Sequence, residues 1–331
     1  MQAFVTGGTG FLGSSVVRKL LERGAKVKAL ARASSDLSNI EGLDLELVQG
    51  DLTDAASWKS ALEDCDSAFH VAADYRLWVP DPERMFEINV EGTRQVLDAA
   101  IENGVKKIVY TSTVGALAYP KEGEVSNEES EPSHEDMVGP YKQSKFEAEL
   151  VARRFAADGH PLAIVLPSTP IGPGDIKPTP TGKVIVDCLN GKMPGYVNTG
   201  LNLIDVRDCA EGHILAAEKG QPGGRYILGN RNITLKEMLE IVSSYAGIKP
   251  PRFQIPYAIA YAYALFDTFV ADYITKKPPV APVVGVKLAS HYMYFDASKA
   301  VNELGLPQNP LENALHDAVD WFREKGYVKS S

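Results

Sequence analysis

The stretch TGGTGFLG at residues 6–13 decides the fold. It follows a strand-like AFVTG at 3–7 and precedes a helical pattern over 12–23. Glycines in the spacing Gly-x-Gly-x-x-Gly let a chain turn sharply, approach a pyrophosphate and pack a helix closely on a strand. The free N–H groups of that helix then face the phosphates. The context predicts dinucleotide binding rather than a merely structural turn, through Gly7, Thr9, Gly10, Phe11, Leu12 and Gly13.

Short apolar runs alternate with helical patterns from this turn to about residue 166. Such alternation is typical of a parallel sheet with helices on both faces. We therefore predict an α/β fold with a doubly wound parallel sheet, and a dinucleotide-binding Rossmann domain over 1–166. The further expected strands are 26–31, 45–51, 67–73, 106–112 and 162–167, and the further expected helices are 54–63, 83–103 and 141–157.

The alternation of strand and helix patterns ends after Pro167. Residues 167–182 are rich in proline and glycine and predict a loop. Beyond them the sequence shows shorter helical patterns and few strand signals. We expect a smaller, mostly helical substrate-binding region over 167–331, with helices near 208–219, 234–246, 297–304 and 311–324.

The end of the second predicted strand indicates which cofactor binds. An acidic residue at this place holds the free ribose of NAD(H), but the sequence reads Ala31-Arg32. A guanidinium offers a planar fork to a 2′-phosphate. The prediction is NADP(H), with NAD(H) as the alternative if Arg32 is only a solvated loop residue. After the third strand, Asp51 either accepts a hydrogen bond from the adenine amino group or caps the next helix, and Leu52 follows it at the cofactor.

Tyr141 and Lys145 stand four residues apart, on one face of a predicted helix. A nearby ammonium stabilises a phenolate and lowers the pKa of the phenol, which makes tyrosine a usable proton carrier. Ser112 and Thr113 end a strand upstream, at the sheet edge where open α/β sheets bind ligands. A hydroxyl there can orient a substrate oxygen while Tyr141 transfers its proton.

Together with the glycine turn, the segments HVAA (70–73), NVEGT (89–93), YTST (110–113), YKQSK (141–145) and PSTPIGP (167–173) resemble an extended short-chain dehydrogenase/reductase of the NAD-dependent epimerase/dehydratase family. The resemblance covers almost the whole chain. Within that superfamily the chain is most similar to the hopanoid-associated sugar epimerase group, through 73–83, 167–182 and 189–206, and more distantly to dihydroflavonol 4-reductases.

The resemblance implies catalytic roles for Thr113, Tyr141 and Lys145, with Ser112 as the alternative hydroxyl. It also implies an enzyme that moves a hydride between a nicotinamide and a secondary alcohol or ketone carbon. Besides Tyr141 and Lys145, which also bind the cofactor, the cofactor contacts that it adds are Ala72, Ala73, Pro167 and Ser168. The substrate contacts are Asp74, Tyr75, Ser112 and Thr169.

Two other functions stay open at this stage. The first is a nucleotide-sugar epimerase that works through a transient 4-keto sugar. Such an enzyme needs a cation for the sugar's pyrophosphate, and Arg207, Arg231 and Arg252 are candidates. The second is a regulatory protein that binds the cofactor without turnover, for which a complete Thr113, Tyr141 and Lys145 set is unnecessary.

Composition restricts the partners. The formal net charge of −9 argues against nucleic acid, since phosphate binding needs clustered lysines and arginines. Three widely spaced cysteines predict reduced thiols and a cytoplasmic location. Histidines at 70, 134, 160, 213, 291 and 316 lack metal-ligand spacing, so we predict no metal site.

The longest apolar run, IPYAIAYAYALF at 255–266, is too short to span a bilayer. We expect a buried helix there; the alternative is a surface that contacts lipid or an apolar substrate, as in peripheral membrane contact. A small-molecule substrate and a homodimer formed through helices 83–103 and 141–157 complete the expected partners.

Overall fold

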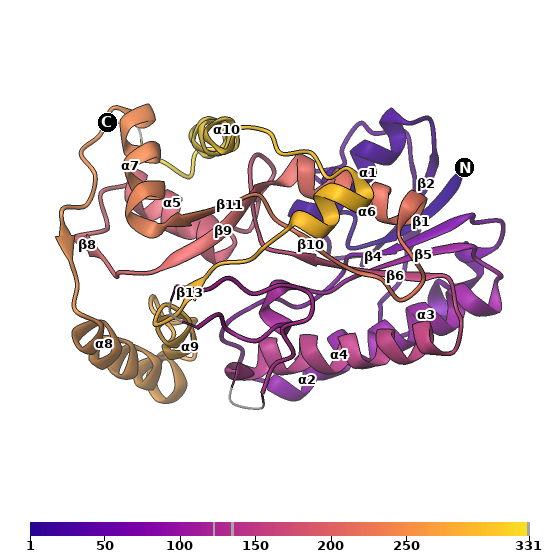
Figure 1. Ribbon diagram of the computed structural model, residues 1–331, viewed down its shortest axis with the longest axis horizontal. Coiled ribbons are helices and arrows are strands. Elements are labelled where there is room, and N and C mark those ends of the chain that lie inside the picture. The colour runs from indigo at the N-terminus through magenta and orange to yellow at the C-terminus, as the bar shows by residue number, and fades with distance from the viewer. Residues whose placement is uncertain (122, 134–135, 330–331) are drawn as a thin grey trace.

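The fold is that of a computed structural model, which describes residues 1–121, 123–133 and 136–329; His134 lies outside them. Seven parallel strands form the central sheet in the order β10-β6-β5-β4-β1-β2-β3, as Figure 1 shows. Successive strands run outward on either side of β1, which opens a crevice at its carboxyl end. The strands are β1 (Gln2–Thr6), β2 (Lys26–Ala31), β3 (Glu46–Gln49), β4 (Ser67–His70), β5 (Lys107–Thr111), β6 (Leu162–Pro167) and β10 (Arg225–Leu228).

Helices cover both faces of this sheet, which confirms the doubly wound α/β prediction. On one face, α1 (Phe11–Glu22) packs against α6 (Val206–Lys219). On the other, α3 (Gly92–Glu102) packs against α4 (Gly139–Ala157), and the two pairs lie above and below the sheet in Figure 1. The helix predicted at 83–103 is present as α2 (Pro82–Phe86), a π-helical turn at 87–91 and α3.

The helix predicted at 54–63 is wrong. This segment forms two 3₁₀ turns, Ala55–Ser57 and Lys59–Leu62, separated by Trp58 with φ −143°. The indole of Trp58 stacks on Phe4 at 5.8 Å and donates its Nε1–H to the carbonyl of Asp51 at 2.9 Å. Anchoring this large side chain in the core outweighs the weak preference of so short a segment for an α-helix.

The expectation of few strands beyond residue 167 is also wrong. β9 (Gly200–Asp205) pairs with β7 (Thr169–Ile171), β11 (Arg231–Thr234) and β13 (Tyr292–Met293). Two further short strands, β8 (Gly195–Tyr196) and β12 (Phe253–Gln254), pair with each other. A second apolar core lies under these strands and is closed by the helices α5 (Pro180–Leu189), α7 (Leu235–Ala246) and α10 (Leu311–Glu324).

The predicted helices 208–219, 234–246 and 311–324 correspond to α6, α7 and α10, whereas 297–304 ends in a π-helical turn at Ala300–Leu304. Both β10 and α6 belong to the core of the central sheet although they follow residue 167. The division of the chain at 166 stays a prediction.

The apolar run near 255–266 forms α8 (Tyr257–Val270), which continues through a π-helical turn (Ala271–Thr275) toward α9 (Val283–Leu288). The prediction that this helix is buried is wrong, because Ala264 is the only buried residue of α8. α8 lies at the periphery of the molecule, with α9 between it and the α2–α4 layer (Figure 1). Among the described residues, no helix is both long and apolar enough to cross a membrane.

Candidate functional site

The glycine turn between β1 and α1 has the shape that a pyrophosphate requires. Gly7 has φ +73°, and a Cβ at this residue would lie 2.7 Å from the amide nitrogen of Ala72. A Cβ at Gly13 would lie 2.0 Å from the carbonyl oxygen of Gly7. Gly10 caps α1 without a side chain that accepts the first-turn N–H groups. The turn therefore leaves these donors directed at a bound anion, as a dinucleotide needs.

The end of β2 carries no acidic side chain. Ala31 is buried and Arg32 is exposed. The loop is fixed by Arg32 N–H donating to the Ser35 hydroxyl at 3.1 Å and by Ser35 N–H donating to the Arg32 carbonyl at 2.9 Å. Arg32 lies close enough to Asp51 that its charge helps to lower the pKa of that carboxyl, after the larger effect of hydrogen bonds from Thr53.

Asp51 accepts hydrogen bonds from the amide and hydroxyl of Thr53, at 3.0 and 2.8 Å. The residue that precedes the first 3₁₀ turn is Asp54, so Asp51 does not cap it. Leu52 is buried, and its side chain packs so closely on Gly92 that a Cβ there would lie only 2.8 Å from it. Leu52 thereby joins the β3 edge to α3.

Helix α4 carries Tyr141 and Lys145 into the crevice. Gly139 has φ +83° and Pro140 follows in the first turn, so the helix starts two residues before the phenol. The buried ammonium of Lys145 donates to the Tyr110 hydroxyl at 3.0 Å and to the Thr111 carbonyl at 2.6 Å. Burial lowers the pKa of Lys145 to about 7, and the charge of Glu149 opposes this shift. Lys145 is thus anchored to the end of β5.

The Thr113 hydroxyl is the one beside the phenol. Burial raises the pKa of Tyr141, and a hydrogen bond with Thr113 opposes this shift. Thr113 also accepts the Gly115 N–H at 3.0 Å, which fixes its rotamer. Ser112 instead donates to the carboxylate of Glu149. The two neighbouring hydroxyls therefore point to different partners, and only Thr113 is paired with Tyr141.

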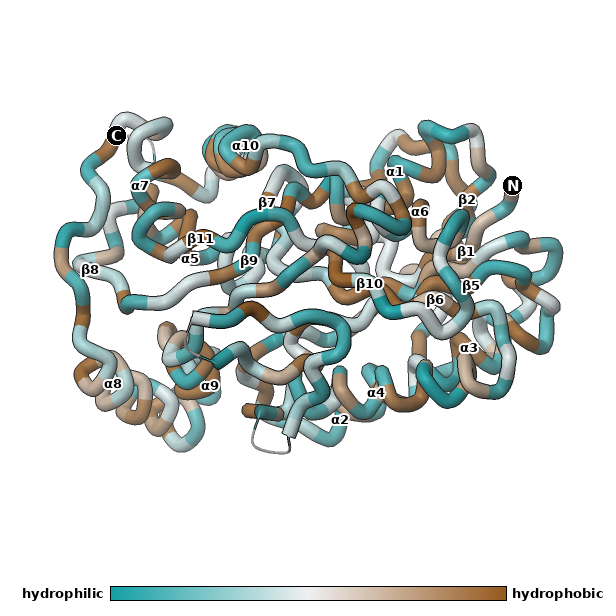
Figure 2. The backbone as a smooth tube through the Cα atoms, viewed as in Figure 1, coloured by the Kyte–Doolittle hydropathy of each residue, from teal (hydrophilic) through white to brown (hydrophobic). Residues whose placement is uncertain are grey.

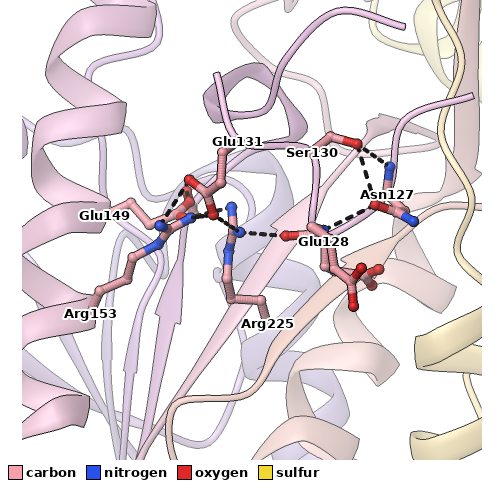
Figure 3. Close-up of polar contacts among 9 residues, drawn as sticks. Asn127, Glu128, Ser130, Glu131, Glu149, Arg153 and Arg225 are labelled. Carbon is pink, nitrogen blue, oxygen red and sulfur yellow. Dashed lines mark hydrogen bonds and ion pairs between the residues drawn. The ribbon is translucent and has the colours of Figure 1, made fainter. Parts of the chain in front are cut away.

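Glu149 is the centre of a polar cluster that sequence reasoning missed (Figure 3). Its side chain is 1% exposed; it accepts a hydrogen bond from Arg153 Nε at 3.0 Å and forms an ion pair with Arg225 Nη2 at 2.9 Å. Glu131 bridges the same two arginines, at 3.0 Å from Arg153 and 3.1 Å from Arg225. The cluster ties α4 to β10 and to the loop that carries Glu128, whose carboxylate accepts the Ile227 N–H at 2.8 Å.

A second buried chain of polar groups connects the phosphate turn with the helix layer. Thr6 pairs with His70 Nδ1 at 2.7 Å, and His70 Nε2 pairs with Thr93 at 2.9 Å. Thr93 donates to the carbonyl of Asn89 at 2.6 Å, and Asn89 donates to Ser144 at 2.9 Å. Burial lowers the pKa of His70 to about 3, so its imidazole is neutral. His70 therefore serves as a structural link between β4, the glycine turn and α3.

The remaining predicted cofactor contacts lie along the strand ends. Ala72 donates its N–H to the Thr6 hydroxyl at 3.2 Å, and Ala73 follows it in the loop after β4. Pro167 ends β6. The hydroxyl of Ser168 is buried and has no hydrogen-bond partner within the described residues. An unsatisfied buried hydroxyl at this edge is suited to a polar group of a bound ligand.

Three of the predicted substrate contacts, Asp74, Tyr75 and Thr169, lie in the segments that follow β4 and β6, at the mouth expected for the site. Asp74 pairs with Arg76, while the phenol of Tyr75 lies within 3.4 Å of the Lys177 carbonyl. Burial, with the charges of Asp175, Asp74 and Tyr141, raises the pKa of Tyr75 to about 12, so Tyr75 lies within electrostatic range of Tyr141. Thr169 begins β7 at the end of the same crevice.

Asp175 is a further residue at this mouth that the sequence did not single out. It accepts the amide and hydroxyl of Thr179 at 2.9 Å, and burial raises its pKa to about 6. No periodicity or spacing marks it. Its neighbour Gly174 accepts a hydrogen bond from Asn39 at 2.8 Å, and Asn39 also reaches the Thr9 carbonyl at 3.4 Å. Asn39 thus joins the glycine turn to the loop that carries Gly174 and Asp175.

This fold and this site define the class: an NAD(P)-dependent enzyme of the extended short-chain dehydrogenase/reductase type. The model of the NAD dependent epimerase/dehydratase family matches residues 3–229, and the chain belongs to this family.

Three relatives illustrate its range. A Synechocystis protein provisionally named dihydroflavonol 4-reductase is 47% identical, covering 99% of this chain and 96% of its own. Sterol demethylase protein B of Methylococcus capsulatus is 33% identical, covering 99% and 100%. The crystal structure of a nucleoside-diphosphate-sugar epimerase from Pseudomonas aeruginosa superposes with a TM-score of 0.83 at 26% identity, covering 99% of both chains.

Proposed function

We propose that this protein is an NADP(H)-dependent oxidoreductase that interconverts a secondary alcohol and a ketone. The observation that supports the proposal is that Thr113 pairs with Tyr141, while Lys145, four residues further along α4, is anchored to the end of β5. When bound there, a nicotinamide cofactor supplies or accepts the hydride at the carbon that bears the substrate oxygen. The protein's own groups handle the proton and the orientation of that oxygen.

Each of the three residues has a separate task in the proposal. Tyr141 gives its phenolic proton to the oxygen during reduction and takes it back during oxidation. Thr113 donates a hydrogen bond to the same oxygen and holds it in reach of the phenol. Lys145 is fixed by Thr111 and Tyr110, so its positive charge stays at the bottom of the crevice. A cation there favours the phenolate when the proton leaves Tyr141.

NADP(H) is the proposed cofactor, with NAD(H) as the alternative. The end of β2 offers an exposed guanidinium and no carboxylate that would repel a 2′-phosphate. Parallel titrations of NADPH and NADH test this proposal. Arg32→Ala is expected to weaken NADPH binding by about ten- to one-hundredfold, the value of a charge-assisted contact, and to leave NADH binding unchanged. Equal affinity for the two cofactors, or an unchanged NADPH affinity in the variant, contradicts it. Arg94→Ala, an exposed arginine on α3, is the matched control.

The proposed substrate is a bulky, largely apolar ketone. Two relatives carry the names dihydroflavonol 4-reductase and sterol demethylase protein B, which both denote polycyclic molecules. The approach to Tyr141 is bordered by Tyr75, by Leu77 near Gly285, and by Val284 against Gly139. A screen of polycyclic and linear ketones with both reduced cofactors tests the class. Turnover that Tyr141→Phe abolishes supports the assignment, and turnover that survives this substitution refutes the mechanism.

The fold likeness to a nucleoside-diphosphate-sugar epimerase keeps epimerisation through a 4-keto sugar as the second candidate. Two of the arginines predicted to hold the sugar's pyrophosphate are engaged elsewhere: Arg207 pairs with Asp205 and Asp317, and Arg231 pairs with Glu312. An ultraviolet spectrum of the purified protein separates the two functions. Tightly retained NAD(H) favours the epimerase, and net consumption of NADPH favours the reductase.

A regulatory protein that only binds the cofactor is the third candidate. The pairing of Thr113 with Tyr141 and the burial of Lys145 argue against it, because binding alone gives no reason to bury that charge. The cytoplasmic location and the homodimer through helices 83–103 and 141–157 stay predictions.

A further inference from the structure

The face that α8 presents to solvent is apolar throughout. At 3.6 residues per turn, Ile259, Tyr263, Leu265, Phe266 and Phe269 fall on the outward side of the helix, and each is between 49% and 67% exposed. The segment that follows the helix adds three residues that are between 66% and 73% exposed: Tyr273, Ile274 and Val280. We call these eight residues the α8 face. In Figure 2 this part of the chain lies on the outer boundary of the molecule.

The polarity of the helix is the reverse of that in an ordinary surface helix. Asp267, its only charged residue, is turned toward α9 and accepts the Ala281 N–H at 2.8 Å. Thr268 accepts the Val283 N–H at 3.1 Å on the same inner side. A surface helix of a soluble protein normally buries its apolar stripe and exposes its charges. Contiguous exposed apolar surface of this kind marks a site of interaction with a partner or a membrane.

The chain segment that carries the α8 face is positively charged, although the protein as a whole is acidic. Residues 249–290 hold five basic and two acidic side chains, a net charge of +3, so the remainder of the chain carries −12. The basic residues are all exposed: Lys249, Arg252, Lys276, Lys277 and Lys287. Of the two acids, Asp267 is engaged as above and Asp272 accepts the Trp78 Nε1–H at 2.7 Å. Lysines beside an apolar, tyrosine-rich helix match the interface of an anionic bilayer.

We propose that the α8 face docks this enzyme on the surface of an anionic lipid bilayer. The apolar side chains enter the boundary between headgroups and acyl chains, and the five cations contact the lipid phosphates. A second copy of the chain docked on this face would bring two sets of these basic residues together, which is unfavourable. Anionic lipid instead complements their charge. This charge complementarity selects the bilayer as the occupant.

The docking face is connected to the catalytic crevice by direct contacts. Trp78 reaches Asp272 from the loop that follows Tyr75. On its other side, α9 contacts the helix that carries Tyr141. A Cβ on Gly139, at the start of that helix, would lie only 2.9 Å from the side chain of Val284 in α9. Docking would therefore place the mouth of the site next to the lipid phase. This consequence rests on the proposed function, because an apolar ketone substrate would then enter the site from the membrane.

Flotation with vesicles tests the docking without any turnover. The purified full chain is mixed with vesicles of phosphatidylcholine alone or of phosphatidylcholine with phosphatidylglycerol, and the bound fraction is measured. We expect the wild type to bind the anionic vesicles. In Lys276→Glu/Lys277→Glu the partition coefficient should fall by about tenfold or more relative to the wild type. Lys106→Glu/Lys107→Glu, an adjacent and exposed lysine pair at the start of β5, is the matched control and should bind as the wild type does.

The apolar part is tested in the same assay with Phe266→Ser/Phe269→Ser, against Leu47→Ser as an exposed apolar control on β3. Loss of binding in the first variant only is expected. Hydrogen exchange of the wild type supplies a measurement that needs no variant: vesicles should protect 257–275. Absence of flotation, or a stable dimer in solution that covers 257–275 and ignores vesicles, overturns the proposal. Tyr141→Phe should float normally, so a failure of the proposed reaction remains distinguishable from a failure of docking.

Discussion

The hydroxyl of Ser112 donates a hydrogen bond to the buried carboxylate of Glu149. This bond separates two adjacent hydroxyls that the sequence could not tell apart. It directs Ser112 into the cluster of Arg153 and Arg225, and the next residue along the chain, Thr113, is left to face Tyr141. In the proposed mechanism, the hydroxyl that acts with Tyr141 is therefore selected by a carboxylate on α4, and not by the residue type at either position.

This relationship predicts different outcomes for the two hydroxyl deletions. Thr113→Val should lower kcat/KM by about one-hundredfold or more, because the substrate oxygen loses a donor that is aligned with Tyr141. Thr113→Ser keeps the hydroxyl and should restore most of the activity. Ser112→Ala should change kcat/KM by less than about tenfold while lowering thermal stability, since Glu149 loses a buried donor. Steady-state kinetics of the three variants with the ketone found by screening provides the comparison. A larger loss in Ser112→Ala than in Thr113→Val would reverse the assignment.

Glu149 is expected to act on the reaction through Lys145. The charge of Glu149 opposes the lowering of the pKa of Lys145 by burial. In Glu149→Gln the lysine should lose its proton at a lower pH, so the fall in kcat/KM on the alkaline side should move toward acid by about one unit. The measurement is the pH dependence of kcat/KM, with Glu131→Gln as the control. Glu131 contacts the same arginines but is 58% exposed, so solvent should screen its charge from Lys145. If the alkaline fall of kcat/KM stays at the same pH in Glu149→Gln, Glu149 does not act through Lys145.

Burial of the Lys145 ammonium should lower the free energy of unfolding, and this effect should depend on pH. The pKa of Lys145 is about 7 in the folded protein, against 10.5 for an ordinary lysine, so the unfolded chain binds more protons between these values. Stability from this group therefore rises with pH across that window and is lowest below pH 7. Lys145→Met should abolish activity yet stabilise the fold, with the largest gain at about pH 6 and a smaller one at about pH 9. Denaturant unfolding at both pH values tests this, and a gain that grows with pH would contradict it.

Much of the fold follows from local patterns that a sequence displays. The six strands before residue 168 each contain a short apolar run, and the glycine turn, Tyr141 and Lys145 are marked by residue type and spacing. Two elements were beyond such reasoning. β10 is only four residues long, and its place beside β6 depends on pairing across the chain. The exposure of α8 was misjudged because an apolar run specifies that a helix seeks an apolar environment, without saying whether that environment is inside the protein.

The same limit applies to the site. Spacing brought Tyr141 and Lys145 together because both belong to one helix turn. The contact of Glu149 with Arg225 joins α4 to β10, and the contact of His70 with Thr93 joins β4 to α3. Such long-range pairs carry no periodic signal in a single sequence. They become visible only when the strands and helices are placed in space.

The glycine turn leads to a prediction about cofactor binding. A Cβ at Gly13 would lie 2.0 Å from the Gly7 carbonyl oxygen, and both atoms belong to rigid backbone. Gly13→Ala must therefore push α1 away from β1 and displace the N–H groups that face the phosphates. We expect NADPH binding to weaken by about one-hundredfold or more and the fold to lose about 1–3 kcal/mol, the usual range for overpacking. Calorimetric titration and thermal unfolding measure the two effects.

Gly285→Ala is the control for the general effect of adding a methyl group at a glycine. Gly285 lies in α9, and its Cβ would have no neighbour nearer than 3.5 Å, which is an ordinary contact. This substitution should leave cofactor affinity unchanged and stabilise the helix by about 0.5–1 kcal/mol, because alanine loses less backbone freedom than glycine on folding. If Gly13→Ala binds NADPH as tightly as Gly285→Ala does, the phosphates do not lie on this turn, and the cofactor would have to be placed elsewhere along the carboxyl edge of the sheet.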